Sequence, residues 1–483
     1  MLRSGGLSDV LNDSQTRCGC GEKRDRIETE QTLTRMGTGA MQLVRREFLK
    51  SGAALVAAPA LVHHVQGADR AGSRYNWGHT MDFGQQYHVR MLEIMEKIRR
   101  NEMNLVGDLS SRMAECLAKG GNVWMQSQVG HMPTNEFSQD HQANPQFLKS
   151  STSLDVKMHR YDRMQRGDVL LTNYVNDQVH AVRERGVYVI GVPVCYIDNE
   201  TAPRGYVLPN ANDWLLGDVS SVILQSYIPH TQGIVDCPEI PEMKICPSSS
   251  NSLCGLYWMF QAEVANKFTH KTAKHVDKSA LFLDTLLERV DRAYSQQKDY
   301  LCDHAAVVAK RIGKGGHYHA FSDPGAVGHE ATGVAMGPMM TNAFSGLLKG
   351  SATDRTKGDV FLLACTEPDA PVIVKKAQES REKGIFVVSI GPGNSVQLRK
   401  YSDVFIDNFS PEGHGLIEIA GLEKKVATAG DIINNWLMWI FTAQFVDEMV
   451  RRGWVPWFWM GGFRVGGNAY NNANRPFFLE QGF

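Results

Sequence analysis

Two groups of histidine and glutamate residues in the second half of the chain could move protons. His329-Glu330 follows the short apolar segment 318–321, and Glu412 and His414 follow the apolar segment 405–407. Moving a proton between adjacent carbons, as in aldose–ketose isomerisation, needs an imidazole or carboxylate base and a polar group on the carbonyl oxygen. We therefore predict Glu330, His329 and His414 as catalytic candidates. The alternative is that the histidines only cap or pack against the helices that follow them.

Hydroxyl and imidazole side chains at the ends of apolar segments are candidates for holding a ligand. In open α/β sheets, ligands bind outside the carboxyl ends of the strands, where these residues are expected to lie. The ligand-binding candidates are Ser322 and Thr366 in the second half of the chain and Ser127, His131 and Thr172 in the first.

A metal site is an alternative interpretation of the same region. His317 and His319 alternate around Tyr318, so both side chains would point to one face of a strand. Together with His329 and Glu330 they could hold zinc in a metal-dependent hydrolase. The first half has Asn122 and Trp124 at the matching positions, so we predict no metal ligands.

The elements that would position these residues occur twice along the chain. Five matches appear in the same order, at offsets between 191 and 198 residues: Leu92-Glu93 with Leu287-Glu288, Lys119-Gly120-Gly121 with Lys314-Gly315-Gly316, Val129-Gly130-His131 with Val327-Gly328-His329, Gly167-Asp168-Val169 with Gly358-Asp359-Val360, and Arg183-Glu184-Arg185-Gly186 with Arg381-Glu382-Lys383-Gly384. Self-similarity at a fixed long period indicates a repeated structural unit.

Each copy alternates helical stretches with continuous apolar segments, which is typical of parallel strands buried on both faces. The predicted fold is α/β, with two tandem three-layer αβα units. Segments 234–236 and 405–407 look like the next strand of each copy, at an offset of only 171, so an insertion of about 27 residues is expected within 199–232. Apolar helices over 253–268 and 432–449 are expected to close the two copies.

This order of elements resembles the sugar isomerase (SIS) domain family, especially its phosphoheptose-isomerase-like branch. The resemblance implies a flavodoxin-like fold, a sugar or sugar phosphate as the small-molecule partner, and isomerase chemistry if the protein is catalytic. In the family, the loop after the Gly-Asp-Val strand is rich in Ser and Thr, which hold the phosphate. Here that loop reads Cys365-Thr366-Glu367-Pro368-Asp369, and its two carboxylates are expected to repel a dianion. A neutral sugar, or a carbohydrate-binding or sensing module without catalysis, is therefore an open alternative.

The segment before the first copy looks like an export signal. Arg45-Arg46-Glu47-Phe48-Leu49-Lys50 and the Ala-rich stretch after it resemble a twin-arginine signal, which predicts a periplasmic or otherwise exported protein. Because the signal lies so far into the chain, just after Met36 and Met41, we expect an over-extended reading frame. The predicted divisions are a leader with signal over 1–67, SIS-like domains over 75–270 and 279–453, and an aromatic tail over 454–483.

Composition excludes several classes of function. The 51 basic and 52 acidic residues give a net charge of −1, so no nucleic-acid partner is expected. No run of about 18 apolar residues is present, which argues against an integral membrane protein. Neither a dinucleotide-binding fingerprint nor a Walker loop occurs, so no cofactor is expected. The seven cysteines after the signal are expected to be packed thiols, and the aromatic tail to pack on the fold or in a homo-oligomer.

Overall fold

The computed structural model describes residues 81–127, 143, 148–152, 160–194, 206, 214–270, 277–323, 327–332, 334–343, 358–413 and 415–483. These residues belong to one compact unit, which spans 56–483. The predicted export signal, His131 and His414 lie outside the described residues.

The first sheet has five parallel strands, namely β1 (Val123–Ser127), β2 (Leu148–Thr152), β3 (Val169–Thr172), β4 (Tyr188–Gly191) and β5 (Val222–Ile223). Their order across the sheet is β2-β1-β3-β4-β5. Strands β1, β3 and β4 match apolar segments expected from the sequence, whereas the edge strands β2 and β5 have no recognisable pattern in it.

The second sheet has the same order and direction of strands. It consists of β8 (Tyr318–Ser322), β9 (Thr341–Ala343), β10 (Val360–Ala364), β11 (Phe386–Gly391) and β12 (Val404–Asp407), arranged β9-β8-β10-β11-β12. Val123 aligns with Val169 in the first sheet, and Tyr318 with Val360 in the second. The sequence offsets match Val123 with Tyr318 and Val169 with Val360, so the two sheets pair their first two central strands at equivalent residues. The predicted α/β class with two parallel sheets is confirmed.

One strand assignment from the sequence is wrong. Ile234 and Val235 belong to β6 (Gly233–Val235), which pairs antiparallel with β7 (Ile245–Pro247) outside the first sheet. The true counterpart of β12 is β5, since both pair with the end of the preceding strand. A two-residue strand carries no recognisable pattern, so the apolar triplet nearby gives the stronger signal. The second half forms a smaller version of the β6–β7 hairpin, an antiparallel bridge between Ile417 and Val426.

Helices cover both faces of each sheet. On the outer faces, α6 (Asp177–Glu184) and α7 (Leu216–Val219) pack on the first sheet, and α11 (Pro371–Glu382) and α12 (Val396–Lys400) on the second. The inner layer is shared and holds α4 (Phe83–Asn101), α5 (Met103–Ala118), α8 (Ser249–Thr269), α9 (Asp277–Ile312) and α13 (Gly430–Val450). The closing helices predicted from the sequence are α8 and α13. Smaller elements are η3 (Arg160–Arg163), α10 (Val327–Glu330) and α14 (Gly467–Gln481).

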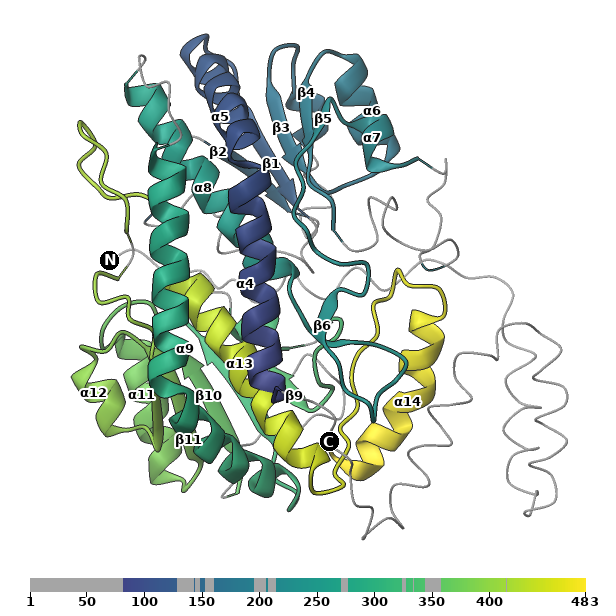
Figure 1. Cartoon of the computed structure of the whole chain (residues 1–483), viewed down its shortest axis with the longest axis vertical. Coiled ribbons are helices and arrows are strands. Elements are labelled where there is room, and N and C mark those ends of the chain that lie inside the picture. The colour runs from purple at the N-terminus through teal and green to yellow at the C-terminus, as the bar shows by residue number, and fades with distance from the viewer. Residues whose placement is uncertain are drawn as a thin grey trace, which may run out of the picture. The chain divides into compact units, whose positions relative to one another are not determined.

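The two halves exchange helix contacts in the inner layer. Helix α13 packs against α9 and α4, while α8 packs against α5 and α9 (Figure 1). Glu263 on α8 accepts hydrogen bonds from the backbone N–H groups of Lys278 and Ser279, at 2.9 and 3.0 Å, at the start of α9. Asp447 on α13 accepts one from Phe83 at the start of α4, at 3.4 Å. Each closing helix therefore caps the long helix of the other half.

Burial in this layer explains two features of the composition. Almost every residue of α8 and α13 is buried, which accounts for their mainly apolar sequences and means that their polar residues are buried as well. None of the helices that the structure describes is long and apolar enough to cross a membrane. The six described cysteines after the signal are free thiols, and only Cys302 is partly exposed.

The aromatic tail packs on the fold, as predicted. Trp457 and Phe458 are buried, and the backbone of 457–459 exchanges hydrogen bonds with Met336, Gly337 and Met339. Helix α14 then follows, and Phe477 stacks on Trp457 at 5.9 Å between ring centroids.

Candidate functional site

The carboxyl ends of the second sheet and the start of α13 form the first candidate site, which we call the sheet-edge site. Ser322 at the end of β8 aligns with Ala364 at the end of β10, and Thr366 follows two residues later. A Cβ placed on Gly430, the first residue of α13, would lie 3.3 Å from Thr366 Cγ2 and 3.8 Å from Ser410 Cβ. Residues from two strand ends therefore meet at one helix terminus.

Two buried hydroxyl groups at this site lack partners. Thr366 is 2% exposed and Thr428 is 1% exposed, and neither Oγ1 has a hydrogen-bond partner among the described residues. Leaving a buried polar group unpaired costs about 1–3 kcal/mol, so such groups usually have a bound water, ion or ligand as partner. Helix α13 also has no side-chain cap at its start. Thr366 is predicted from the sequence, whereas Thr428 lies in a loop without a recognisable motif.

A chain of amide hydrogen bonds holds this edge in place. Asn434 Nδ2 donates to the Cys365 carbonyl at 2.9 Å, and Asn408 Nδ2 donates to Asn434 Oδ1 at 2.7 Å. Asn408 Oδ1 in turn accepts the Ser410 N–H at 2.9 Å. These bonds tie the loops after β10 and β12 to the first turn of α13. The Asn434-Asn435 pair inside an otherwise apolar helix is the one signal of this network in the sequence.

Three of the seven positive-φ residues other than glycine in the described part of the chain lie around the same edge. Asp369, Phe409 and Ala427 have positive φ angles of 53°, 52° and 61° without being glycine. Such residues cost about 1–3 kcal/mol each and cluster at binding sites. Their position in the loops that surround α13 supports a functional role for the edge.

The expected repulsion of anions by Glu367 and Asp369 needs a correction. Asp369 accepts the backbone N–H groups of Val396 and Leu398, at 3.0 and 2.8 Å, and so caps α12 instead of facing α11. The Asp369 carboxylate is therefore already hydrogen-bonded to the start of α12. Glu367 lies against Gly413, and Asp431 is an acidic residue in the first turn of α13. Two carboxylates still disfavour a dianion here, but they are Glu367 and Asp431.

Glu330 lies in a second polar cluster, between the helices of the two halves. Ser250 Oγ on α8 donates to Glu330 Oε2 at 2.5 Å. Glu330 is 1% exposed. Burial raises the pKa of the Glu330 carboxyl from 4.5 to about 7, although Ser250 and the Trp439 indole each lower it in part. A carboxyl that titrates near neutral pH suits general acid–base catalysis.

Residues from both halves complete this cluster, which we call the interhelix cluster. Tyr87 on α4 donates to the Pro247 carbonyl at 3.0 Å and accepts from Asn251 Nδ2 at 3.0 Å. Asn435 Nδ2 on α13 donates to Asn251 Oδ1 at 3.0 Å. Asn251 is in the first turn of α8 and Asn435 in the second turn of α13, so their bond joins the two halves. Only the tertiary structure reveals this set, because its members come from four separate parts of the chain.

The predicted site residues do not all face one place. His329 is exposed while its neighbour Glu330 is buried. Ser322 Oγ accepts the Gly328 N–H at 2.8 Å and so holds the start of α10. Thr366 belongs to the sheet-edge site, and Glu330 to the interhelix cluster. In the first half, Thr172 Oγ1 accepts the Tyr174 N–H at 3.0 Å in a local turn. Ser127 ends β1, but its side chain, like His131 and His414, is outside the described residues.

The metal alternative does not fit the geometry. His317 Nδ1 lies 3.1 Å from Asp359 Oδ1, and His319 Nε2 lies 3.5 Å from Asp359 Oδ2, at the amino end of β8. Glu330 follows the opposite, carboxyl end of that strand. Asn122 and Trp124 contact Asp168 in the same way in the first half. Both histidines therefore serve a structural role that the first half fills without histidine, and no metal-binding group of three or more ligands occurs in the described part of the chain.

Comparisons with known proteins place the chain among distant relatives. No family model matches it. It is 22% identical over 228 residues to a UPF0309 protein of Streptomyces griseus, covering 39% of this chain and 90% of the relative.

Among solved structures, the chain is similar to the C-terminal domain of glucosamine-fructose-6-phosphate aminotransferase from Francisella tularensis, with a TM-score of 0.44 and 11% identity, over 80% of this chain and 100% of that one. It is also similar to tagatose-6-phosphate ketose/aldose isomerase from Escherichia coli, with a TM-score of 0.41 and 10% identity, over 77% and 94% of the two chains.

Proposed function

We propose that this protein is a doubled SIS-type protein that binds a sugar or sugar derivative at the sheet-edge site. The observation that carries the proposal is the pair of buried hydroxyls of Thr366 and Thr428, which have no hydrogen-bond partner among the described residues and lie beside the uncapped start of α13. Hydroxyls and backbone N–H groups are the donors that a sugar requires. The strand order β2-β1-β3-β4-β5, repeated in the second sheet, is the flavodoxin-like order, which the family resemblance implies.

The charge of the site favours a neutral sugar. Glu367 and Asp431 lie at the start of α13, where a sugar phosphate would bring a further negative charge. Two unit charges at 4 Å repel by about 1 kcal/mol in water and by more in a partly buried site. A helix terminus contributes only about 0.3–1 kcal/mol to anion binding, so it does not offset this repulsion.

If the protein turns the sugar over, we propose aldose–ketose isomerisation with Glu330 as the base, and His329 and His414 as the remaining candidates. The pKa of about 7 supports Glu330 in that role. Its burial and its place in the interhelix cluster, apart from the sheet-edge site, favour the second candidate function, a carbohydrate-binding or sensing module without catalysis, because a base must reach the proton that it abstracts. Turnover of a sugar panel by purified protein distinguishes the two.

Binding of neutral sugars should weaken when the two hydroxyls are removed. Thr366→Val and Thr428→Val keep the shape of each side chain but cannot form a hydrogen bond. A neutral hydrogen bond contributes about 0.5–1.5 kcal/mol, so each variant should lose about 2- to 10-fold in affinity, measured by calorimetry with a panel of aldoses and ketoses. Thr285→Val is the control, since Thr285 Oγ1 is exposed on α9 and bonds only its own helix. Unchanged affinity in the double variant would remove the sheet-edge site from the proposal.

We also propose that the protein is exported by the twin-arginine route, on the strength of Arg45-Arg46. Replacing both with Lys should leave full-length protein in the cytoplasm of a producing bacterium, since the pair is the feature that the route reads. Fractionation followed by immunoblotting measures this. Lys23→Arg serves as the control, outside the signal. Export and shortening of the double-Lys protein would contradict the prediction.

A further inference from the structure

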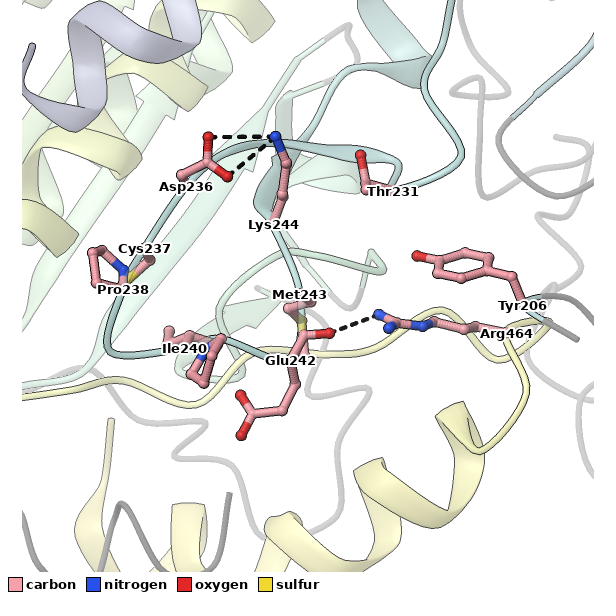
Figure 2. A pocket seen from close by; sticks show the side chains of 11 residues that line it. Tyr206, Thr231, Asp236, Cys237, Pro238, Ile240, Glu242, Met243, Lys244 and Arg464 are labelled. Atoms are coloured by element: carbon pink, nitrogen blue, oxygen red, sulfur yellow. Dashed lines mark hydrogen bonds and ion pairs between the residues drawn. The ribbon is translucent and has the colours of Figure 1, made fainter. Parts of the chain in front are cut away.

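A pocket of about 380 Å³ lies away from both polar clusters, where the β6–β7 hairpin meets the tail (Figure 2). Its lining comes from three parts of the chain: the hairpin loop between β6 and β7 together with Thr231 just before β6, then Tyr206, and Arg464. Pockets of this size hold a monosaccharide or a similar small molecule.

Two of these parts have no counterpart in the second half. Tyr206 belongs to the connection between β4 and β5, residues 192–221, whereas the matching connection between β11 and β12 covers only 392–403. Arg464 belongs to the tail after α13. The pocket is therefore formed partly by segments that occur in the first half and the tail alone.

The side chain of Arg464 is held by groups that do not neutralise it. Arg464 Nη1 donates to the Glu242 carbonyl at 2.9 Å, and the guanidinium lies 4.5 Å from the centre of the Tyr206 ring. The Val465 N–H also donates to the Tyr206 carbonyl at 3.0 Å. Arg464 forms no ion pair with a carboxylate of the described residues, and the Glu242 carboxylate points away from it (Figure 2).

The charged residues that line the pocket balance in number, with Arg464 and Lys244 against Asp236 and Glu242, but they are not paired equally. Asp236 accepts both Lys244 Nζ, at 3.1 Å, and Arg90 Nη2, at 2.7 Å, so two cations share one carboxylate. The pKa of His230, which contacts the Tyr206 ring, is lowered by burial and by the charges of Arg464 and Lys244. A guanidinium that no carboxylate of the described residues pairs with, beside an aromatic side chain and apolar residues, is suited to an organic anion.

We propose that this pocket binds a sugar-sized organic anion, with its carboxylate or phosphate on Arg464 and Lys244. The guanidinium presents a planar fork of N–H donors, which matches the two oxygens of a carboxylate or phosphate group. Pro238, Ile240 and Met243 supply the apolar surface for the rest of the molecule. The site is separate from the proposed sheet-edge site and does not depend on it.

Calorimetry on the full chain with glucose, glucuronate, glucose 6-phosphate and inorganic phosphate tests this proposal. We expect glucuronate or glucose 6-phosphate to bind, with the affinity falling at high salt, and Arg464→Gln to weaken that binding at least tenfold. Lys244→Gln should weaken it less, since Arg90 then keeps Asp236 paired. The two anionic sugars distinguish a carboxylate from a phosphate ligand, and inorganic phosphate alone shows whether the sugar part contributes.

Matched variants separate the role of Arg464 from effects of total charge and of misfolding. Arg100→Gln removes one exposed charge on α4 and should leave binding unchanged. Arg464→Lys keeps the charge without the fork, and should retain part of the affinity if the fold is intact, which the melting temperature verifies. Thr366→Val should not affect anion binding. Anion binding that survives Arg464→Gln, or that is lost in Thr366→Val instead, would overturn the proposal, as would the absence of binding by every anion at millimolar concentration.

Discussion

Replacing Glu330 with Gln is expected to stabilise the protein at pH 8. The pKa of this acid is raised from 4.5 to about 7, so the folded state binds its proton more tightly than the unfolded state does. Stability therefore falls as pH rises from about 4.5 to about 7, and the loss is complete above pH 7. A pKa raised by this much corresponds to a loss of about 3 kcal/mol of folding stability at high pH. Gln does not titrate, and its amide can still form a hydrogen bond with Ser250. The gain in folding stability of the Gln variant over the original protein should therefore be near zero at pH 4.5 and largest at pH 8.

Denaturant unfolding of both proteins between pH 4.5 and 8 measures this effect. Glu288→Gln, an exposed substitution on α9, is the control and should change stability by no more than about 0.5 kcal/mol at any pH. A constant difference across the pH range would mean that Glu330 stays ionised in the folded protein. If the protein is an isomerase, the same variant should abolish turnover while the affinity for sugar stays within about tenfold, because the amide cannot take a proton.

Replacing Asp168 with Ala is expected to cost about 1–3 kcal/mol of folding free energy for each buried donor that loses its acceptor. Asp168 is 3% exposed and accepts hydrogen bonds from Asn122 N at 2.8 Å, Trp124 Nε1 at 2.9 Å and Gln165 N at 3.1 Å. Truncation leaves the indole N–H, itself in the core, without its acceptor. Urea unfolding of the variant against Asp162→Ala, an exposed aspartate in η3, measures the loss.

Asp359→Ala in the second half provides the matched comparison. Asp359 accepts the His317 N–H at 2.9 Å and contacts both His317 and His319. We expect a loss of similar size, because the two aspartates occupy the same place before β3 and β10. A loss below about 1 kcal/mol in both variants would contradict the structural role that we assign to this pair. If Asp359→Ala alone lost little folding free energy, His317 and His319 would need a role other than the structural one that we assign to them.

The regular part of the fold is predictable from the sequence. Strands buried on both faces, such as β3 and β10, need continuous apolar residues, and Lys-Gly-Gly ends the helices before β1 and β8. Thr366 is predictable for a similar reason, since it directly follows a predicted strand. The edge strands β2, β5 and β9 are not. Strands β5 and β9 have only two and three residues, and β2 is largely polar, so none of them has a recognisable apolar pattern.

The α/β class and the residues that follow each strand can be predicted without coordinates, because both depend on patterns over a few neighbouring residues. Which of those residues meet depends on how distant segments pack. Adjacent residues on a short helix turn point in different directions, so His329 and Glu330 separate although they are neighbours. Ser250 and Glu330 meet although they are 80 residues apart in the sequence, since the start of α8 of one half lies against α10 of the other. Burial at that junction, which no local pattern encodes, is also what raises the pKa of Glu330.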